Sequence, residues 1–318
     1  MFNRKNKLLA LKIISLFSVV RGYNIPIIIL AQYLSAIFIL APEIRALDIL
    51  LDFSLFLIVF ASSITIASGY IINSFYDSRK DLINRPNKST LDRLVSQSTK
   101  LKVYFTLNFI VAIIALVISF RAFLFFSFYI FLIWFYSHKI KKYPLIGNLM
   151  AAILAVLPFF AILLYYYTKI PLYEIQVYKS QFMVISAHAT FLFLLLLIRE
   201  MIKDLENIKG DLVDNYNTIP VHYGAEISKR IITFLCFATL IPVYILIAIY
   251  DVGYMDIYFY ICLIILIFFL KYLWKSNTKA QFLLLHNVLK FLIVSGVFCI
   301  ILINPSVLWH GKKLLLSF

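Results

Sequence analysis

Residues 181–201 read QFMVISAHATFLFLLLLIREM, and this apolar run leads directly into the polar stretch IKDLENIKGD at 202–211. A run of about 20 apolar residues is long enough to cross the hydrocarbon core of a membrane as a helix. The full set of nine predicted spans is 20–41, 46–73, 102–119, 121–137, 145–167, 181–201, 231–250, 255–273 and 288–306. The pattern therefore predicts an all-α membrane protein with about nine transmembrane helices in one bundle around a central cavity, and a single domain over residues 1–318.

The amino-acid composition supports this fold class. Hydrophobic residues make up 63% of the 318 positions and charged residues only 14%, whereas soluble domains have roughly 45–50% and about 25%. A soluble fold of this size could not bury so much apolar surface, so the excess must face lipid. The three cysteines, Cys236, Cys262 and Cys299, lie in apolar runs, which argues against a disulfide framework and against a cysteine-based metal site.

The net charge of +15 is distributed unevenly between the two sides of the predicted spans. With the N-terminus in the cytoplasm, the cytoplasmic segments and adjoining span ends hold 23 of the 30 Lys and Arg residues; the opposite side holds six, including Lys312 and Lys313. This bias agrees with the positive-inside rule. Because the N-terminal stretch has no small-residue cleavage site, we expect it to be retained in the cytoplasm. We expect membrane lipid around the chain and no nucleic-acid partner.

A first polar cluster follows the second predicted span. Asn73, Asp77 and Asp81 are spaced four residues apart, so they share one side of the helix if it continues beyond the span. Two carboxylates and an amide on one stripe favour a cation between them, and oxygen ligands without His or Cys favour Mg²⁺ or Ca²⁺. The alternative is a polar helix end that simply leaves the membrane. The basic residues that follow suit either a bound diphosphate or an ordinary cytoplasmic loop, and they are Arg79, Lys80, Arg85, Lys88 and Arg93.

A second acidic cluster lies at the end of the sixth predicted span. Glu200 stands one turn before Asp204, and Asp211 follows Asp204 by seven residues, so they share a face if the helix persists. Because Gly210 weakens a helix, we expect Asp211 at a helix end or in a loop. A surface helix with Glu–Lys pairs would have a similar sequence.

The charge count places both clusters on the same side of the membrane, each at the end of a long span. Facing carboxylates there predict a site for two Mg²⁺ ions and one diphosphate, in which the metal stabilises the leaving group. Acidic groups at membrane depth are candidate functional residues in general. The expected ligands are Asn73, Asp77 and Asp81 for one ion, and Asp204 and Asp211, with Glu200 nearby, for the other.

The two clusters resemble the aspartate-rich motifs of a known family. Residues 73–81, NSFYDSRKD, are similar to the first motif of the UbiA superfamily of intramembrane prenyltransferases, and residues 81–86, DLINRP, to the stretch that follows it. Residues 199–211 resemble the second motif. The likeness is strongest to the digeranylgeranylglyceryl phosphate synthase and homogentisate prenyltransferase branches, although Asn207 and Lys209 stand where these branches often have acidic residues.

Shorter stretches extend the resemblance over most of the chain. Arg21 and Asn24 look like the family's polar pair near the start of the first span. The family's turn between the fourth and fifth spans is matched by Tyr136, Lys141 and Gly147-Asn148. The family's segment after the second motif is matched by Thr218-Ile219-Pro220 and Gly224. Residues 87–90, NKST, depart from the family's common Arg-Pro-Leu continuation.

The resemblance implies a Mg²⁺-dependent enzyme that transfers a prenyl group from a prenyl diphosphate to a hydrophobic acceptor. The candidate catalytic residues are Asp77, Asp81, Asp204 and Asp211, and the candidate metal ligands are these four with Asn73 and Glu200. The candidate substrate-binding residues are Arg21, Asn24, Tyr76, Arg85, Tyr136, Lys141 and Lys203. Their cationic donors suit diphosphate oxygens, and the faces of Tyr76 and Tyr136 suit an allylic cation.

Several functions remain open at this point. The second motif favours geranylgeranylglyceryl phosphate as the acceptor, and the alternative is an aromatic quinone precursor. A secondary transporter that carries ions on its intramembrane acids is a rival from another class, as is a structural scaffold with two solvated helix ends. The low Gly and Pro content, 8 and 9 residues, argues against the broken helices that transporters often use.

Overall fold

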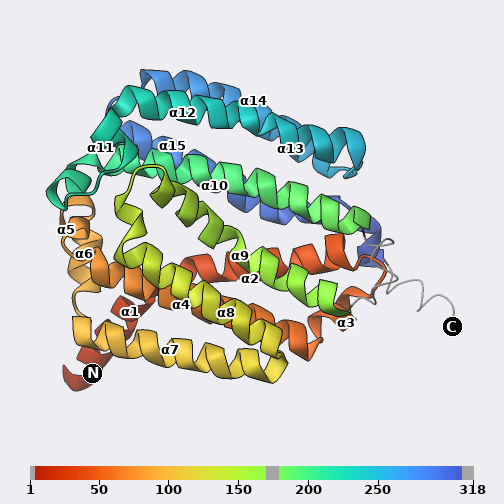
Figure 1. Ribbon diagram of the computed structural model, residues 1–318, viewed down its shortest axis with the longest axis horizontal. Helices are drawn as coiled ribbons and strands as arrows, with labels where there is room; N and C mark the ends of the chain where they lie inside the picture. Colours follow the sequence, from red (N-terminus) through yellow and green to blue (C-terminus); the bar gives the residue numbers. More distant parts are fainter. Residues whose placement is uncertain (1–3, 170–178, 310–318) are drawn as a thin grey trace.

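The helices of the molecule lie side by side along its long axis (Figure 1). The computed structural model describes residues 4–169 and 179–309, and no strand occurs in them. Nine helical segments of this described part are long and apolar enough to cross a membrane, as predicted. They are Gly22–Leu40, Phe53–Tyr76, Gln97–Ile118, Phe120–Lys142, Ile146–Thr168, Lys179–Val213, Ala225–Ile249, Met255–Lys275 and Lys279–Leu302.

These spans are built from longer and shorter helices. The helices are α1 (Arg4–Val20), α2 (Ile25–Ser35), α3 (Ala46–Leu50), α4 (Phe53–Tyr76), α5 (Lys80–Asn84), α6 (Pro86–Asp92), α7 (Gln97–Ile118), α8 (Phe120–His138), α9 (Ile146–Lys169), α10 (Lys179–Val213), α11 (Ile219–Tyr223), α12 (Ala225–Ala238), α13 (Leu240–Tyr244), α14 (Met255–Lys275) and α15 (Lys279–Cys299). A 3₁₀ turn, η1 (Gly22–Asn24), precedes α2, another, η3 (Ile140–Lys142), follows α8, and π-helical turns η2 (Ala36–Leu40) and η5 (Ile245–Ile249) extend α2 and α13.

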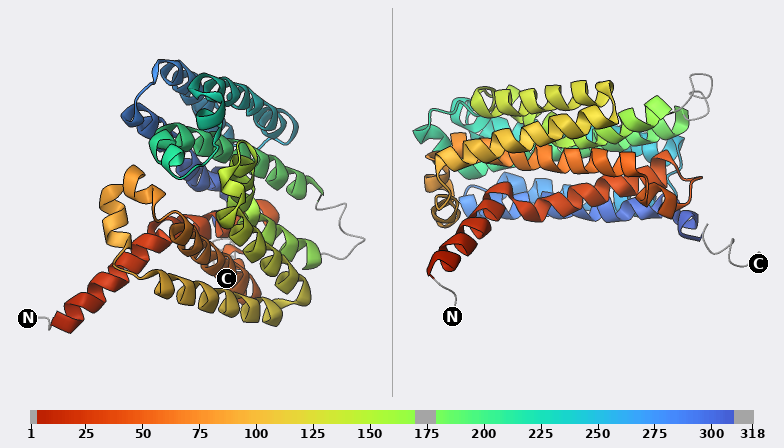
Figure 2. Two further views of the ribbon diagram at one scale, coloured as in Figure 1. Left: turned by 60° about the vertical axis from the view of Figure 1, so that its left-hand side comes forward. Right: turned by 90° about the horizontal axis from the view of Figure 1, so that it is seen from below.

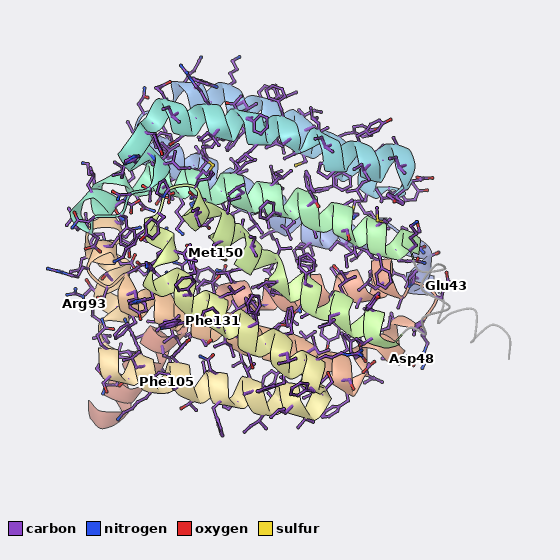
Figure 3. All side chains as sticks on the ribbon, viewed as in Figure 1. Glu43, Asp48, Arg93, Phe105, Phe131 and Met150 are labelled. Carbon is purple, nitrogen blue, oxygen red and sulfur yellow. The ribbon has the colours of Figure 1, made fainter. Side chains whose placement is uncertain are left out.

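The outer surface of the bundle is rich in large apolar side chains, unlike that of a soluble protein. α4 packs against α7 and α8, and α10 packs against α9, α12 and α15. Phe105 on α7 and Phe131 on α8 (Figure 3) are 66% and 50% exposed. Such side chains on long spans face lipid, because hydrocarbon stabilises them where water would not.

Several predicted boundaries differ from the structure, and helix caps explain two of the differences. The span predicted from residue 46 begins at Phe53, because the Asp52 side chain caps α4 by accepting from the Ser54 and Leu55 amides. The span predicted from residue 288 begins nine residues earlier, at Lys279, after a capping box formed by Thr278 and Gln281. α10 extends from the predicted end at 201 to Val213. The segments before 20 and between 74 and 101, outside the predicted spans, contain the additional helices α1, α5 and α6.

The two ends of the bundle differ in the short helices that they carry. α1, α5, α6 and α11 gather at one end, called the α5 end below, and α3 lies at the other (Figure 1). Arg93 and Asp48 mark these two ends in Figure 3. Both predicted acidic clusters lie at the α5 end. Lys312 and Lys313, which the charge count places on the opposite side, lie outside the described residues.

Candidate active site

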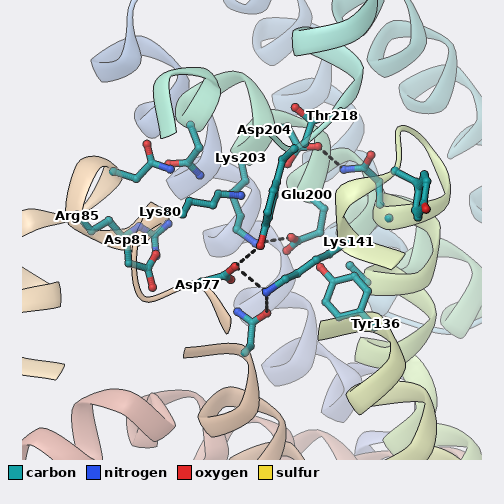
Figure 4. Close-up of a pocket in the computed structure, with 18 of the residues that line it drawn as sticks. Asp77, Lys80, Asp81, Arg85, Tyr136, Lys141, Glu200, Lys203, Asp204 and Thr218 are labelled. Carbon is teal, nitrogen blue, oxygen red and sulfur yellow. Dashed lines mark hydrogen bonds and ion pairs between the residues drawn. The ribbon is translucent and has the colours of Figure 1, made fainter. Parts of the chain in front are cut away.

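A polar pocket opens at the α5 end of the bundle (Figure 4). Its walls come from α4, α5, α8, η3, α9, α10, the segment that follows α10 and the junction between α1 and η1. The lining residues are Arg21, Asn73, Asp77, Lys80, Asp81, Asn84, Arg85, Tyr136, Lys141, Tyr143, Gly147, Asn148, Ala151, Glu200, Lys203, Asp204, Asn207, Tyr216 and Thr218. The two acidic motifs, far apart in the sequence, therefore meet in one pocket.

The first motif lies on a broken helix and not on the continuous one that we expected. α4 ends at Tyr76, Asp77 is its C-cap residue, and α5 begins at Lys80. Two backbone hydrogen bonds of helical register bridge the break, from the Asp77 amide to the Asn73 carbonyl and from the Asp81 amide to the Asp77 carbonyl, both 2.9 Å long. Because of these bonds, all three side chains still line the pocket.

Asp77 is the most heavily coordinated carboxylate of the first motif. Its Oδ1 accepts from Lys141 Nζ at 2.6 Å and from the Tyr216 hydroxyl at 2.8 Å, and Lys141 Nζ also donates to Asn73 Oδ1 at 3.2 Å. Burial alone would raise the pKa of Asp77, but the ammonium groups of Lys141 and Lys80 outweigh it and leave this pKa below its ordinary value. Asp77 is therefore an ionised anchor of the pocket.

Asp81 has a different electrostatic environment. Burial and the neighbouring Asp77 carboxylate raise its pKa above the ordinary value, against the opposing charges of Arg21 and Arg85. The helix that carries it, α5, is held at its C-terminus by Lys279 Nζ, which donates to the Asn84 carbonyl at 2.6 Å. This contact fixes the far end of the broken motif to α15.

The second motif lies on one unbroken helix of 35 residues, α10. Our expectation that Asp211 would lie at a helix end is confirmed, because α10 continues through Gly210 and ends at Val213, which places Asp211 in its last turn. The reason for the glycine is tertiary: a Cβ built at residue 210 would lie 2.3 Å from Nδ2 of Asn84. Glycine thus allows α5 to pack directly on α10, which brings the two motifs together.

Each acid of the second motif has its own partner. Glu200 pairs with Lys203 at 2.6 Å and with Arg199 at 3.1 Å. Asp204 Oδ2 accepts from Asn148 Nδ2 at 2.7 Å, in the pocket itself. Asp211 is fully buried outside the pocket lining, where its carboxylate pairs with Lys80 Nζ at 2.5 Å and accepts from the Thr218 hydroxyl at 3.2 Å.

The structure places ten of the predicted site residues in the pocket lining: Arg21, Asn73, Asp77, Asp81, Arg85, Tyr136, Lys141, Glu200, Lys203 and Asp204. Three others lie outside it. Asn24 donates to the Tyr70 hydroxyl at 3.2 Å, the Tyr76 ring centre is 5.8 Å from Lys141 Nζ, and Asp211 lies behind Lys80. The catalytic, metal-binding and substrate-binding roles assigned to these residues remain predictions.

The sequence did not single out two pocket residues, Lys80 and Tyr216. Lys80 Nζ lies 4.3 Å from the centre of the Tyr216 ring, and these two residues connect the acids of the two motifs. Burial and the Asp77 carboxylate raise the pKa of Tyr216 well above its ordinary value, so its hydroxyl remains a donor. Lys80 was one of several basic residues after the first motif, and Tyr216 is one of 21 tyrosines; neither carries a signal of its own.

The chemistry of the pocket fits a hard divalent cation. Among residues 4–169 and 179–309, no three His, Cys, Asp or Glu side chains converge as a metal cluster, since lysines and Asn148 hold the carboxylates. The acidic and amide side chains of both motifs nevertheless supply only oxygen ligands, which Mg²⁺ prefers. Asn207 adds a buried Oδ1 in the pocket wall without a hydrogen-bond donor, and a cation would satisfy this oxygen.

The pocket also fits a multiply charged anion. Five cationic side chains line it, against four carboxylates. The cationic residues are Arg21, Lys80, Arg85, Lys141 and Lys203. Arg21 reaches the pocket from a left-handed backbone conformation, with φ of 51°, at the junction of α1 and η1. Strain of this kind is retained where the surrounding structure demands it, often at functional sites.

Comparison with known proteins identifies similar sequences and folds. The model of the UbiA prenyltransferase family matches residues 29–291. The digeranylgeranylglyceryl phosphate synthase of Thermococcus sibiricus is 31% identical over 187 residues, which cover 59% of this chain and 61% of that protein, less than two thirds of its length. The protein of the same name from Sulfurisphaera tokodaii is 25% identical over 272 residues, which cover 83% of this chain and 90% of that protein.

Two solved structures share the fold. A UbiA homolog from Archaeoglobus fulgidus bound to GPP and Mg²⁺ has a TM-score of 0.65 at 17% identity, with 90% of this chain and 99% of that chain covered. A structure described as digeranylgeranylglyceryl phosphate synthase in membranes has a TM-score of 0.66 at 22% identity, with 91% and 97% covered. At these identities the likeness shows the arrangement of the helices.

Proposed function

Because the chain belongs to the UbiA prenyltransferase family, we propose that it transfers a prenyl group from a prenyl diphosphate to geranylgeranylglyceryl phosphate in a Mg²⁺-dependent reaction. The observation that carries this proposal is the pocket in which acids of two distant motifs and five cations meet, at one end of a lipid-facing bundle. The names of the Thermococcus sibiricus and Sulfurisphaera tokodaii relatives support the choice of acceptor.

The oxygen ligands of the two motifs are the residues that would hold Mg²⁺. On the first motif these are Asn73, Asp77 and Asp81, and on α10 they are Glu200, Asp204, Asp211 and the Asn207 amide oxygen. When bound, Mg²⁺ neutralises charge on the diphosphate and so favours its departure. Asp211 lies outside the pocket lining with Lys80 on its carboxylate, so its share in the site requires Lys80 to release it.

The cationic side chains of the pocket would bind the diphosphate oxygens. Lys203, Arg85 and Arg21 line the pocket from three different segments, and their donors suit phosphate. In the reaction, the bond between prenyl C1 and the diphosphate oxygen breaks, and its electron pair leaves with the diphosphate. The acceptor hydroxyl oxygen forms the new bond to C1, and its proton passes to the departing diphosphate.

Apolar and aromatic groups below the polar lining would hold the rest of the prenyl chain. Tyr136 presents its ring to the pocket, where it would stabilise positive charge on the allylic carbon (Figure 4). A second, mostly apolar cavity includes Phe159 of α9 and Leu195 of α10. Phe159 is roughly 12 Å along α9 from Ala151 in the pocket wall, so α9 and α10 would guide the chain from one cavity to the other.

We place the α5 end of the bundle, with the pocket and the N-terminus, on the cytoplasmic side. This orientation follows the excess of Lys and Arg in the segments at that end. It gives the pocket access to a water-soluble diphosphate leaving group, while the apolar chains of both substrates remain in the membrane.

The test is a product assay on the purified chain in lipid nanodiscs, with geranylgeranyl diphosphate, geranylgeranylglyceryl phosphate and mass spectrometry. We expect the ether product with Mg²⁺ and none after chelation by EDTA. Asp77→Asn should lower turnover by about 100-fold or more, whereas Asp48→Asn, which removes an exposed carboxylate at the opposite end, should leave it unchanged. Turnover that survives EDTA would overturn the metal requirement, and product formed only from an aromatic acceptor would overturn the choice of lipid.

A further inference from the structure

α1 (Arg4–Val20) is a part of the molecule that the proposed reaction does not use. It leaves the bundle sideways at the α5 end (Figure 2) and is separate from the nine candidate spans. The match to the family model begins at residue 29, so α1 also lies outside it. Its position beside the ends of the spans is where membrane headgroups would lie.

The described part of α1 has two distinct sides. On one side, Ser15 and Val19 are buried against the bundle, and the Ser15 hydroxyl donates to the Leu91 carbonyl at 2.7 Å. On the other side, Ile13, Ile14 and Phe17 are 61%, 54% and 59% exposed. At 100° per residue these three fall within a stripe about 100° wide.

The charge of α1 indicates what covers this apolar stripe. The helix contains Arg4, Lys5, Lys7 and Lys12 and no acidic residue. A basic helix with an apolar stripe lies in the membrane interface, with the stripe among the acyl chains and the cations near anionic headgroups. Because α1 projects sideways from the bundle (Figure 2), its exposed stripe would meet the lipid around the spans.

We propose that α1 is an interfacial helix that binds anionic lipid at the α5 end, and that this contact holds the segments flanking the pocket in place. Arg21 of the pocket lining follows α1 directly, so the left-handed turn at Arg21 links the direction of α1 to that side chain. α6 is hydrogen-bonded to α1, since the Ser18 hydroxyl donates to Asp92 Oδ1 at 2.8 Å. α6 in turn follows α5, which carries Asp81.

The lipid contact is tested by nitroxide labels on α1, which need no catalytic activity. Ile13→Cys places the label on the apolar stripe, and Lys12→Cys places it about 150° around α1 from the centre of the stripe. The label of Phe109→Cys on α7, where Phe109 is 68% exposed on a span, gives the hydrocarbon reference. The chain with only its native cysteines measures background labelling. The nanodiscs contain phosphatidylcholine alone or with about one third phosphatidylglycerol.

We expect the label at 13 to collide with oxygen, as at 109, and the label at 12 to collide with a water-soluble nickel complex. Phosphatidylglycerol should deepen the label at 13, and Lys12→Gln should shift its equilibrium about fivefold towards water, the equivalent of about 1 kcal/mol per basic residue. Equal nickel access at 12 and 13 in both nanodiscs would overturn the proposal. A label at 13 shielded from both reagents would also overturn it, because protein and not lipid would then cover the stripe.

The link to the pocket is tested by a label on α5. Leu82 is 38% exposed there, and Leu82→Cys reports the motion of α5 through the width of its spectrum. The double variant Ser15→Ala with Ser18→Ala removes both hydrogen bonds from α1 to α6, and it should increase this motion and abolish its response to phosphatidylglycerol. The matched control is Ser186→Ala, which removes a hydroxyl bonded only to the Phe182 carbonyl on its own helix. An unchanged α5 signal in this double variant would overturn the coupling, whereas the lipid contact is decided by the first test.

Discussion

The two acidic motifs place similar side chains on two kinds of backbone. Asn73, Asp77 and Asp81 lie across a break between α4 and α5, whereas Glu200, Asp204 and Asp211 lie on the unbroken α10. The first motif depends on contacts from elsewhere in the chain, while the second has the rigidity of its own helix. This difference teaches that a spacing of helical period identifies residues that share a face, but not how firmly their backbone holds them.

The largest effect should come from lengthening an acid on the rigid motif. Asp204→Glu moves the carboxylate outward by about one methylene, and α10 cannot shift to compensate, so turnover should fall about 100-fold. Asp81→Glu, on the short helix α5, should cost only about tenfold, because the segment after the break can adjust. Steady-state kinetics in nanodiscs measure both losses, and Asp48→Glu at the far end is the control. Equal losses would break the distinction between a rigid and an adjustable motif.

The next largest effect should come from the contact between Gly210 of α10 and Asn84 of α5, which brings the two motifs together. In Gly210→Ala the new Cβ would overlap Asn84, so α5 must move away from α10. A strain of about 2 kcal/mol corresponds to a loss of about 30-fold in turnover, although alanine alone would favour the helix. Thermal unfolding in detergent and turnover both measure this change.

The double variant Gly210→Ala with Asn84→Ala is the decisive control for this contact. It removes the overlapping side chain, so it should recover part of the lost stability and activity relative to Gly210→Ala. If Asn84→Ala gives no recovery, then Gly210 serves another purpose than the packing of α5.

The sequence predicts the parts of this molecule that depend on local properties. The spans follow from apolar runs long enough to cross a membrane, and the acids of both motifs follow from their spacing at the ends of those runs. The continuation of α10 through Gly210 was not predictable, because its reason is the side chain of Asn84 on a distant segment. Tyr216 likewise gains its place from the turn after α10, where its amide bonds to the Asp211 carbonyl at 2.8 Å.

A smaller effect should follow from removing one hydrogen bond to Asp77 of the broken motif. Tyr216→Phe removes the hydroxyl that donates to Asp77 at 2.8 Å. A hydrogen bond to a charged group contributes about 1.5–3 kcal/mol, so turnover should fall at least about tenfold, with a higher Mg²⁺ concentration for half-maximal rate. Tyr143→Phe, at another lining tyrosine, is the control. An unchanged Mg²⁺ dependence would mean that α4 and Lys141 hold Asp77 without Tyr216.

The smallest effect should come from the Thr218 hydroxyl, which donates to Asp211 of the rigid motif. Thr218→Val removes the donor 3.2 Å from Asp211, a carboxylate that Lys80 already pairs with. Because α10 fixes Asp211 and the bond is long, we expect about a threefold loss of turnover, equivalent to about 0.7 kcal/mol. Thr190→Val, which removes a hydroxyl bonded within α10 itself, should have no effect. A loss as large as that of Tyr216→Phe would show that Asp211 leaves Lys80 and acts in the pocket, and the two motifs would then depend equally on outside support.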